Sequence, residues 1–175
     1  MRARIGLLSF VAILGVTGCS KFIEPSYFKP DPSKYGSVEL CDHYGQFLRG
    51  TLSMNNADVD TPTLGEEDGT VGWNTICHST GKNGIIGTLQ VHQPFLVYKD
   101  DPDEPPSSYR SVAGFDGKAW TGAPLPYWTE VEVRDGNWSA QMSFVKDCPE
   151  QELLTSADIQ KVAEFLVQVA DDLQR

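Results

Sequence analysis

Residues that could act as nucleophiles or metal ligands are few in this chain of 175 amino acids, which holds four cysteines and three histidines. His43, His78 and His92 fall in separate segments, and no pair has the spacing of a zinc motif such as His-Glu-x-x-His. The sequence also has no Gly-x-Ser-x-Gly nucleophile elbow and no glycine-rich phosphate loop. We therefore expect no metal, no cofactor and no catalytic residue of a recognised kind.

The first cysteine, Cys19, comes three positions after an apolar run over residues 5–16, which itself follows two arginines. A run of this length suits the core of a secretory signal and is too short to cross a bilayer as a helix. The residues Val16-Thr17-Gly18-Cys19 resemble the bacterial lipobox, in which the cysteine receives a diacylglyceryl thioether. We expect a lipoprotein signal peptide over residues 1–18 and a lipid anchor at Cys19. This anchor would hold the protein on the extracytoplasmic side of the cell membrane.

The charge balance agrees with an anchored protein that does not bind nucleic acid. The chain has 14 basic and 24 acidic residues, and its net charge of −10 becomes more negative once the arginines of the signal are removed. Binding to nucleic acid depends on cationic contacts to phosphate, and an acidic surface is also repelled by anionic lipid headgroups. The expected membrane contact is therefore made by the lipid chains and not by the protein surface.

A proline-containing segment over residues 19–37 follows the anchor. Pro25, Pro30 and Pro32 interrupt any helical or strand periodicity, and prolines stiffen a chain toward an extended form. We interpret the segment as a spacer between the membrane and the domain. Its aromatic residues offer the alternative of a docking patch.

Residues 38–175 have the length of one domain and show no internal repeat. Apolar residues recur at helical spacing over 39–52 and over the C-terminal segment from Thr155, a typical helix cap, to the end. Between them, short segments rich in β-branched and aromatic residues predict strands at 70–79, 84–93, 94–99, 127–133 and 138–146. The last two are joined by the tight turn Arg-Asp-Gly-Asn, which is typical of a hairpin. The sequence predicts an α+β fold, an antiparallel sheet of about five strands with both helices on one face.

Three cysteines remain in the domain, and disulfides persist outside the cytoplasm. Cys41 in the first helix and Cys77 in the first strand are the preferred pair. Cys148 is then an unpaired thiol, although it could also be the true partner of one of the others. Several acidic residues near Cys148 disfavour the thiolate, so we do not expect it to be a catalytic nucleophile.

The order of these features resembles the small secreted lipoproteins of actinobacteria that carry an uncharacterised extracytoplasmic domain. The features are the lipobox, a helix around Glu39-Leu40-Cys41-Asp42, Trp73 shortly before Cys77, the strand pair "VEVRDGNWSAQMSF", Cys148 and a terminal helix. The resemblance covers most of residues 19–175 and implies a location and a fold, without an activity. One feature departs from the family. A further cysteine is expected before the "VEV" strand, where this chain has Trp128 and Thr129.

Four aromatic residues, Trp120, Tyr127, Trp128 and Trp138, lie close together in the sequence among glycines and prolines. They could cap one end of the core, or they could form a binding surface for a sugar, a lipid or a protein. We expect a non-enzymatic envelope lipoprotein that binds a ligand or a protein partner, or that serves as an accessory subunit of a membrane complex. The alternative is an envelope hydrolase or redox enzyme with an unfamiliar site.

Overall fold

The structure of the protein is a computed structural model that describes residues 36–60, 71, 74–81, 84–93, 107–145 and 154–175. The described elements, in chain order, are α1 (Ser37–Gly50), β1 (Asp58–Val59), β2 (Asn74–Gly81), β3 (Gly84–His92), β4 (Arg110–Ser111), β5 (Ala119–Gly122), β6 (Trp128–Asp135), β7 (Trp138–Val145) and α2 (Ser156–Leu173). Several expectations lie outside these residues: the signal peptide, the lipid anchor, residues 19–35 of the spacer, the strand at 94–99 and Cys148. The last residue of the expected spacer, Ser37, belongs to α1.

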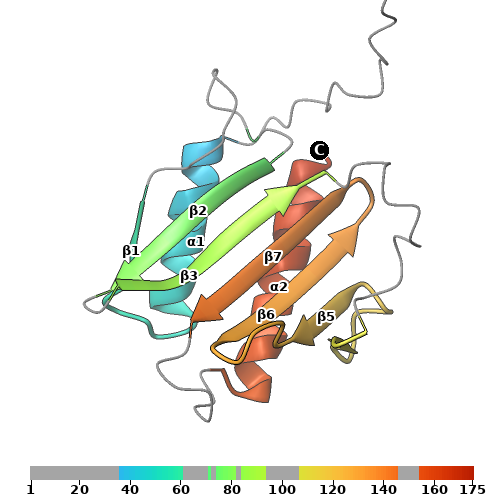
Figure 1. The fold of residues 1–175 in the computed structure, drawn as a ribbon. Coiled ribbons are helices and arrows are strands. Elements are labelled where there is room, and N and C mark those ends of the chain that lie inside the picture. The colour runs from blue at the N-terminus through green and yellow to red at the C-terminus, as the bar shows by residue number, and fades with distance from the viewer. Residues whose placement is uncertain (1–35, 61–70, 72–73, 82–83, 94–106, 146–153) are drawn as a thin grey trace, which may run out of the picture.

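The strands form one antiparallel sheet in the order β1-β2-β3-β7-β6-β5-β4, seen face-on in Figure 1. The α+β class is as predicted, but the sheet has seven strands and the predicted number of about five was too low. β1 and β4 have two residues each and β5 has four. Such short strands show no measurable alternation in the sequence, and β5 lies between Gly117 and Pro126, in a segment whose glycines and prolines are typical of a loop.

Both helices lie behind the sheet in Figure 1, with α1 behind β1 and β2 and α2 behind β6 and β7. Successive side chains of a strand point to opposite faces, so one set of residues faces the helices. On β6 and β7 this set includes Val131, Val133, Ala140, Met142 and Phe144, and all five are buried in the core. The helices therefore cover one face of the sheet, as the pattern of apolar residues in the sequence indicated.

The predicted disulfide joins the first helix to the sheet. Cys41 of α1 and Cys77 of β2 are bonded, with their Cα atoms 5.4 Å apart. The helix is also anchored by a polar contact, because the Tyr44 hydroxyl lies 3.0 Å from the Ser79 hydroxyl, which in turn donates to the Gly87 carbonyl at 2.9 Å. Burial raises the pKa of the Tyr44 phenol, so this group stays neutral in the core.

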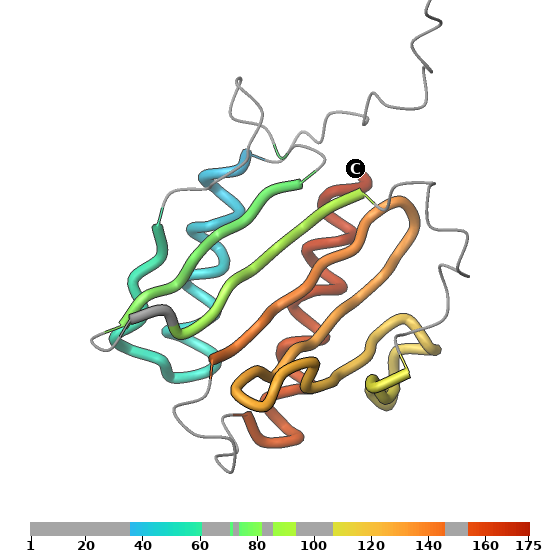
Figure 2. The backbone as a smooth tube through the Cα atoms, viewed as in Figure 1, coloured from blue at the N-terminus to red at the C-terminus, as the bar shows by residue number. Residues whose placement is uncertain are grey.

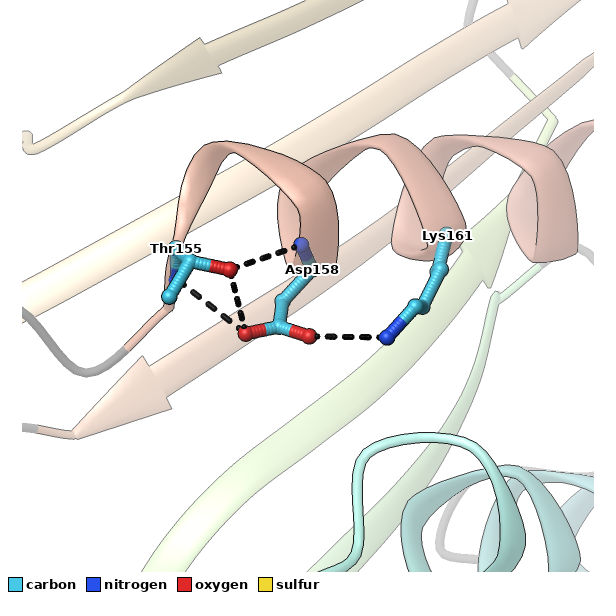
Figure 3. A network of polar contacts seen from close by, with 3 residues as sticks. All are labelled: Thr155, Asp158 and Lys161. Atoms are coloured by element: carbon cyan, nitrogen blue, oxygen red, sulfur yellow. Dashed lines mark hydrogen bonds and ion pairs between the residues drawn. The ribbon is translucent and has the colours of Figure 1, made fainter.

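Helix α2 begins with the cap that the sequence predicted (Figure 3). The Thr155 hydroxyl accepts a hydrogen bond from the Asp158 backbone N–H at 3.2 Å, and the Asp158 carboxylate accepts one from the Thr155 backbone N–H, also at 3.2 Å. Lys161 forms an ion pair with the same carboxylate at 3.2 Å. This reciprocal capping box thus satisfies two backbone N–H groups at the start of the helix, those of Thr155 and Asp158.

The predicted turn between β6 and β7 is also present. Gly136 has a φ of +56°, a conformation that suits glycine, and it lies against Gln174 at the end of α2. Figure 2 shows that this hairpin, the first turn of α1 and the C-terminus of α2 all lie at one end of the domain. The expected spacer therefore enters the described domain at that end.

Candidate functional site

The four aromatic residues of the candidate binding surface do not all lie on one face of the sheet, although Trp120 and Trp128 share a face. Trp138 is buried in the core between the sheet and the helices, whereas Trp120 is buried on the opposite face of the sheet. Trp128 is half-buried, and Tyr127 in the β5–β6 loop is 49% exposed. For Trp138 the core-capping alternative is the correct one, because the period of β7 directs its side chain toward the helices.

The other face of the sheet is the better candidate, since no described helix covers it (Figure 1). We call this surface the open face. Its described residues are Asn74, Ile76 and His78 on β2, Thr88, Gln90 and His92 on β3, Ser139, Gln141, Ser143 and Val145 on β7, Trp128, Glu130, Glu132 and Arg134 on β6, and Trp120 on β5.

Two carboxylates lie on the open face of β6, and both are only 8% exposed. Glu130 accepts a hydrogen bond from the Ser143 hydroxyl at 3.0 Å and a second one from the Tyr109 hydroxyl. Tyr109 approaches the sheet closely because Gly122 has no side chain in its way. Burial and the bond to Glu130 raise the pKa of the Tyr109 phenol.

The second carboxylate, Glu132, is held by two donors on one oxygen. The Ser139 hydroxyl donates to its Oε1 at 3.0 Å, and the Arg134 Nε donates to the same atom at 2.7 Å. The Arg134 guanidinium also lies over the Trp120 ring, 5.4 Å from its centroid. This cation–π contact and ion pair fix both charges at the β5–β6 side of the open face.

The open-face positions of β2, β3 and β7 are uncharged and mostly polar, with Ile76 and Val145 as the apolar exceptions. The described open-face positions of β2, β3 and β7 carry no acidic or basic side chain apart from the two histidines. A hydrogen bond of 3.0 Å from the Gln90 amide to the Asn74 side chain connects two of these strands. Gln141 lies between Gln90 and Glu132 in the register of the sheet and is half-buried.

His78 and His92 both lie on this face, and the Nδ1 atom of each is buried without a hydrogen-bond partner in the part of the chain that the structure describes. Burial lowers the pKa of His92, the nearby Glu132 carboxylate opposes this effect, and Arg134 adds to it. The imidazole is therefore neutral under ordinary conditions, so it adds hydrogen-bonding capacity to the face without adding charge.

The described residues hold no arrangement typical of a catalytic centre. No group of three or more His, Cys, Asp or Glu among them could hold a metal ion. The Ser139 hydroxyl lies beside Glu132 and, in the register, beside His92, but this serine is 1% exposed and a substrate could not reach it. Cys41 and Cys77 are bonded to each other, and Cys148 lies outside the described residues, so the expectation about its reactivity stays a prediction.

Comparison with protein families, with curated proteins and with solved structures finds no match to this chain. None of the described helices is both long and apolar enough to pass through a membrane.

The sequence contains a signal for the open face. The alternation of Thr129, Val131 and Val133 against Glu130 and Glu132 indicates a second face of this strand. The partners of these carboxylates are far away in the chain, so their burial could not be predicted from the alternation. The absence of charged residues at every second position of β2, β3 and β7 was the available signal.

Proposed function

We propose that this chain is a lipid-anchored, non-enzymatic binding protein of the extracytoplasmic side of the cell membrane, and that the open face is its contact surface. It would act by binding a ligand or a protein partner, or as an accessory subunit of a membrane complex. The lipobox-like sequence at Cys19 supports the anchor. The disulfide between Cys41 and Cys77 supports an oxidising compartment, because such bonds are rare in the reducing cytosol.

One observation carries the choice of surface: the centre of the open face is depleted of charge. Solvent-exposed faces usually carry many charged side chains, whereas charged residues are depleted at the centre of protein interfaces. The chain is 22% charged, yet the described open-face positions of three neighbouring strands, β2, β3 and β7, have no Asp, Glu, Lys or Arg. A surface that becomes desolvated on binding avoids charges that would be left unpaired.

Photo-crosslinking in intact cells tests the surface. A photoreactive amino acid at position 141, at the centre of the open face, should form discrete adducts. The same amino acid at position 168, on the exposed side of α2, is the matched control and should form none. Adducts at position 168 alone, or equal diffuse labelling at both positions, would refute the open face as the contact surface.

The anchor is tested separately by the variant Cys19→Ser. The variant should lose incorporation of a fatty-acid probe and should leave the membrane fraction, while its domain keeps the same thermal unfolding midpoint. Unchanged fatty-acid labelling of Cys19→Ser would refute the anchor.

A hydrolase is the second candidate, and the pair Glu130 and Glu132 is the observation in its favour. Two carboxylates on one face of a strand are the groups that many glycoside hydrolases use. Here, however, each carboxylate accepts hydrogen bonds from neighbouring side chains and is almost completely buried. We expect the variant Glu132→Gln to have a lower unfolding free energy than the wild type. Any hydrolytic activity of the wild type should remain in this variant. The enzyme would be favoured instead if the wild type turned over a substrate and Glu132→Gln abolished this activity without changing the stability of the fold.

A further inference from the structure

We infer that the ligand of the open face is a neutral, hydroxyl-rich glycan. This inference rests on the proposed function, because it assigns a chemical class to the contact surface proposed above. It is carried by the kinds of polar group on the face, by the way in which its charges are already paired, and by a half-buried indole at its end.

The centre of the face presents groups that both donate and accept hydrogen bonds. Amides and hydroxyls have this property, and the half-buried side chains that carry them at the described open-face positions of β2, β3 and β7 are Asn74, Thr88, Gln90 and Gln141. The Ser139 and Ser143 hydroxyls are buried and already donate to Glu132 and Glu130, so they are not part of this set. A sugar hydroxyl likewise donates one hydrogen bond and accepts others. Side chains in cross-strand register therefore offer a regular array that suits a ligand with many hydroxyls.

The charges of the face argue against an ionic ligand. Arg134 is the only described cation on the open face, and it is already paired with Glu132 and stacked on Trp120. An anionic ligand would find no available cation at the centre of the face, and it would meet Glu130 and Glu132 at the edge. A cationic ligand would have to compete with Arg134 and with the Tyr109 and Ser143 hydroxyls for the same carboxylate oxygens.

An aromatic side chain lies at one end of the array. Trp128 pairs with Val145 in the register, follows the alternation of Glu130 and Glu132, and is half-buried. The face of an indole ring carries negative potential, so it attracts the polarised C–H groups of a sugar ring. Amide and hydroxyl groups beside a partly exposed tryptophan fit a sugar better than they fit an apolar lipid or the apolar core of a protein interface.

The test measures binding of the full-length chain, purified in mild detergent, to immobilised polysaccharides. The neutral probes are amylose, laminarin, mannan and galactan, and the charged probes are dextran sulfate and polylysine. We expect saturable binding to at least one neutral polysaccharide and none to the charged polymers. Binding only to a charged polymer, or to none of the six, overturns the inference.

Three variants locate the site and distinguish a glycan from a protein partner. Gln141→Lys and Gln141→Leu should each lower the affinity for the neutral polysaccharide about tenfold, because each removes an amide that hydrogen-bonds the ligand. Gln168→Lys, on the exposed side of α2, is the matched control and should bind like the wild type. Thermal unfolding of each variant verifies that it is folded.

If Gln141→Leu binds the polysaccharide as well as the wild type does, the amide is not used and the inference fails. If position 141 forms crosslinks in cells only to a protein and no polysaccharide binds, the glycan is wrong although the open face remains the contact surface. If neither crosslinks nor polysaccharide binding are found, both the glycan and the proposed function fail.

Discussion

Removal of the disulfide between Cys41 and Cys77 should destabilise the domain strongly. The bond joins α1 to the second strand of the sheet, and its two half-cystines are 36 positions apart in the sequence. Without it, α1 remains connected to the sheet through the chain that follows it and through the packing of residues such as Leu40 and Leu48. The perturbation is the double variant Cys41→Ala, Cys77→Ala, which removes only the two sulfur atoms.

The expected magnitude follows from the length of the loop that the bond closes. In the chain-entropy description, closing a loop of 36 residues restricts the unfolded chain enough to stabilise the fold by about 4 kcal/mol. A domain of this size shifts its unfolding midpoint by roughly 3 °C for each kcal/mol, so the double variant should melt about 12 °C lower. The loss of two buried sulfur atoms adds a smaller packing term in the same direction.

Guanidinium unfolding followed by fluorescence is the appropriate assay, with and without a thiol reductant. The wild type in reductant should lose nearly as much unfolding free energy as the double variant, because both have an unrestricted unfolded chain. The double variant itself should not respond to the reductant. If the double variant or the reduced wild type lost less than about 1 kcal/mol of unfolding free energy, the disulfide would not be a major source of stability and this reasoning would be refuted.

Three further perturbations test other parts of the fold. Thr155→Ala should lower the unfolding free energy by about 1 kcal/mol because it removes the α2 cap, and an unchanged denaturation midpoint would contradict this role. Gly87→Ala places a Cβ 2.7 Å from the Ser143 carbonyl oxygen and should cost about 1–3 kcal/mol; its control is Gly50→Ala, whose Cβ meets nothing within 4 Å. The pKa of His92 is lower in the folded state than in the unfolded chain, so the unfolded state takes up a proton first as the pH falls below about 6.5. Stability should therefore decline with falling pH in this range, and by less in His92→Gln; identical slopes for the two proteins would contradict the burial effect.

Local features of the sequence predicted the local features of the fold. The period of residues 159–173, the cap at Thr155 and the turn at Gly136 depend on neighbours within a few positions, and all three are present in the structure. The pairing of Cys41 with Cys77 was also correct, although it joins distant segments. It followed from choosing among only three domain cysteines, with the remaining one placed far along the chain.

Features that depend on contacts between distant strands could not be predicted. β4 and β5 were missed because a two-residue and a four-residue strand have almost no pattern of their own. β5 is defined by its pairing with β6, and β4 by its pairing with β5. The division of the aromatic residues between the two faces could not be predicted for the same reason. Trp120 and Trp138 are close in the sequence, but the sheet directs them to opposite faces, and only the register reveals this.

The distribution of charge over the domain connects the proposed anchor to the proposed binding surface. A chain with a net charge of −10 is repelled by anionic headgroups, so a lipid anchor at Cys19 would hold the domain near the membrane without attracting its surface to it. Helix α1 begins at the end of the domain that contains the β6–β7 hairpin, so the strands of the open face would extend away from an anchor joined to α1 (Figure 2). An acidic domain attached in this way would present the open face, whose centre carries no acidic, lysine or arginine side chain at its described positions. That surface is suited to a long neutral polymer, because contacts along the strands can add up without an electrostatic cost.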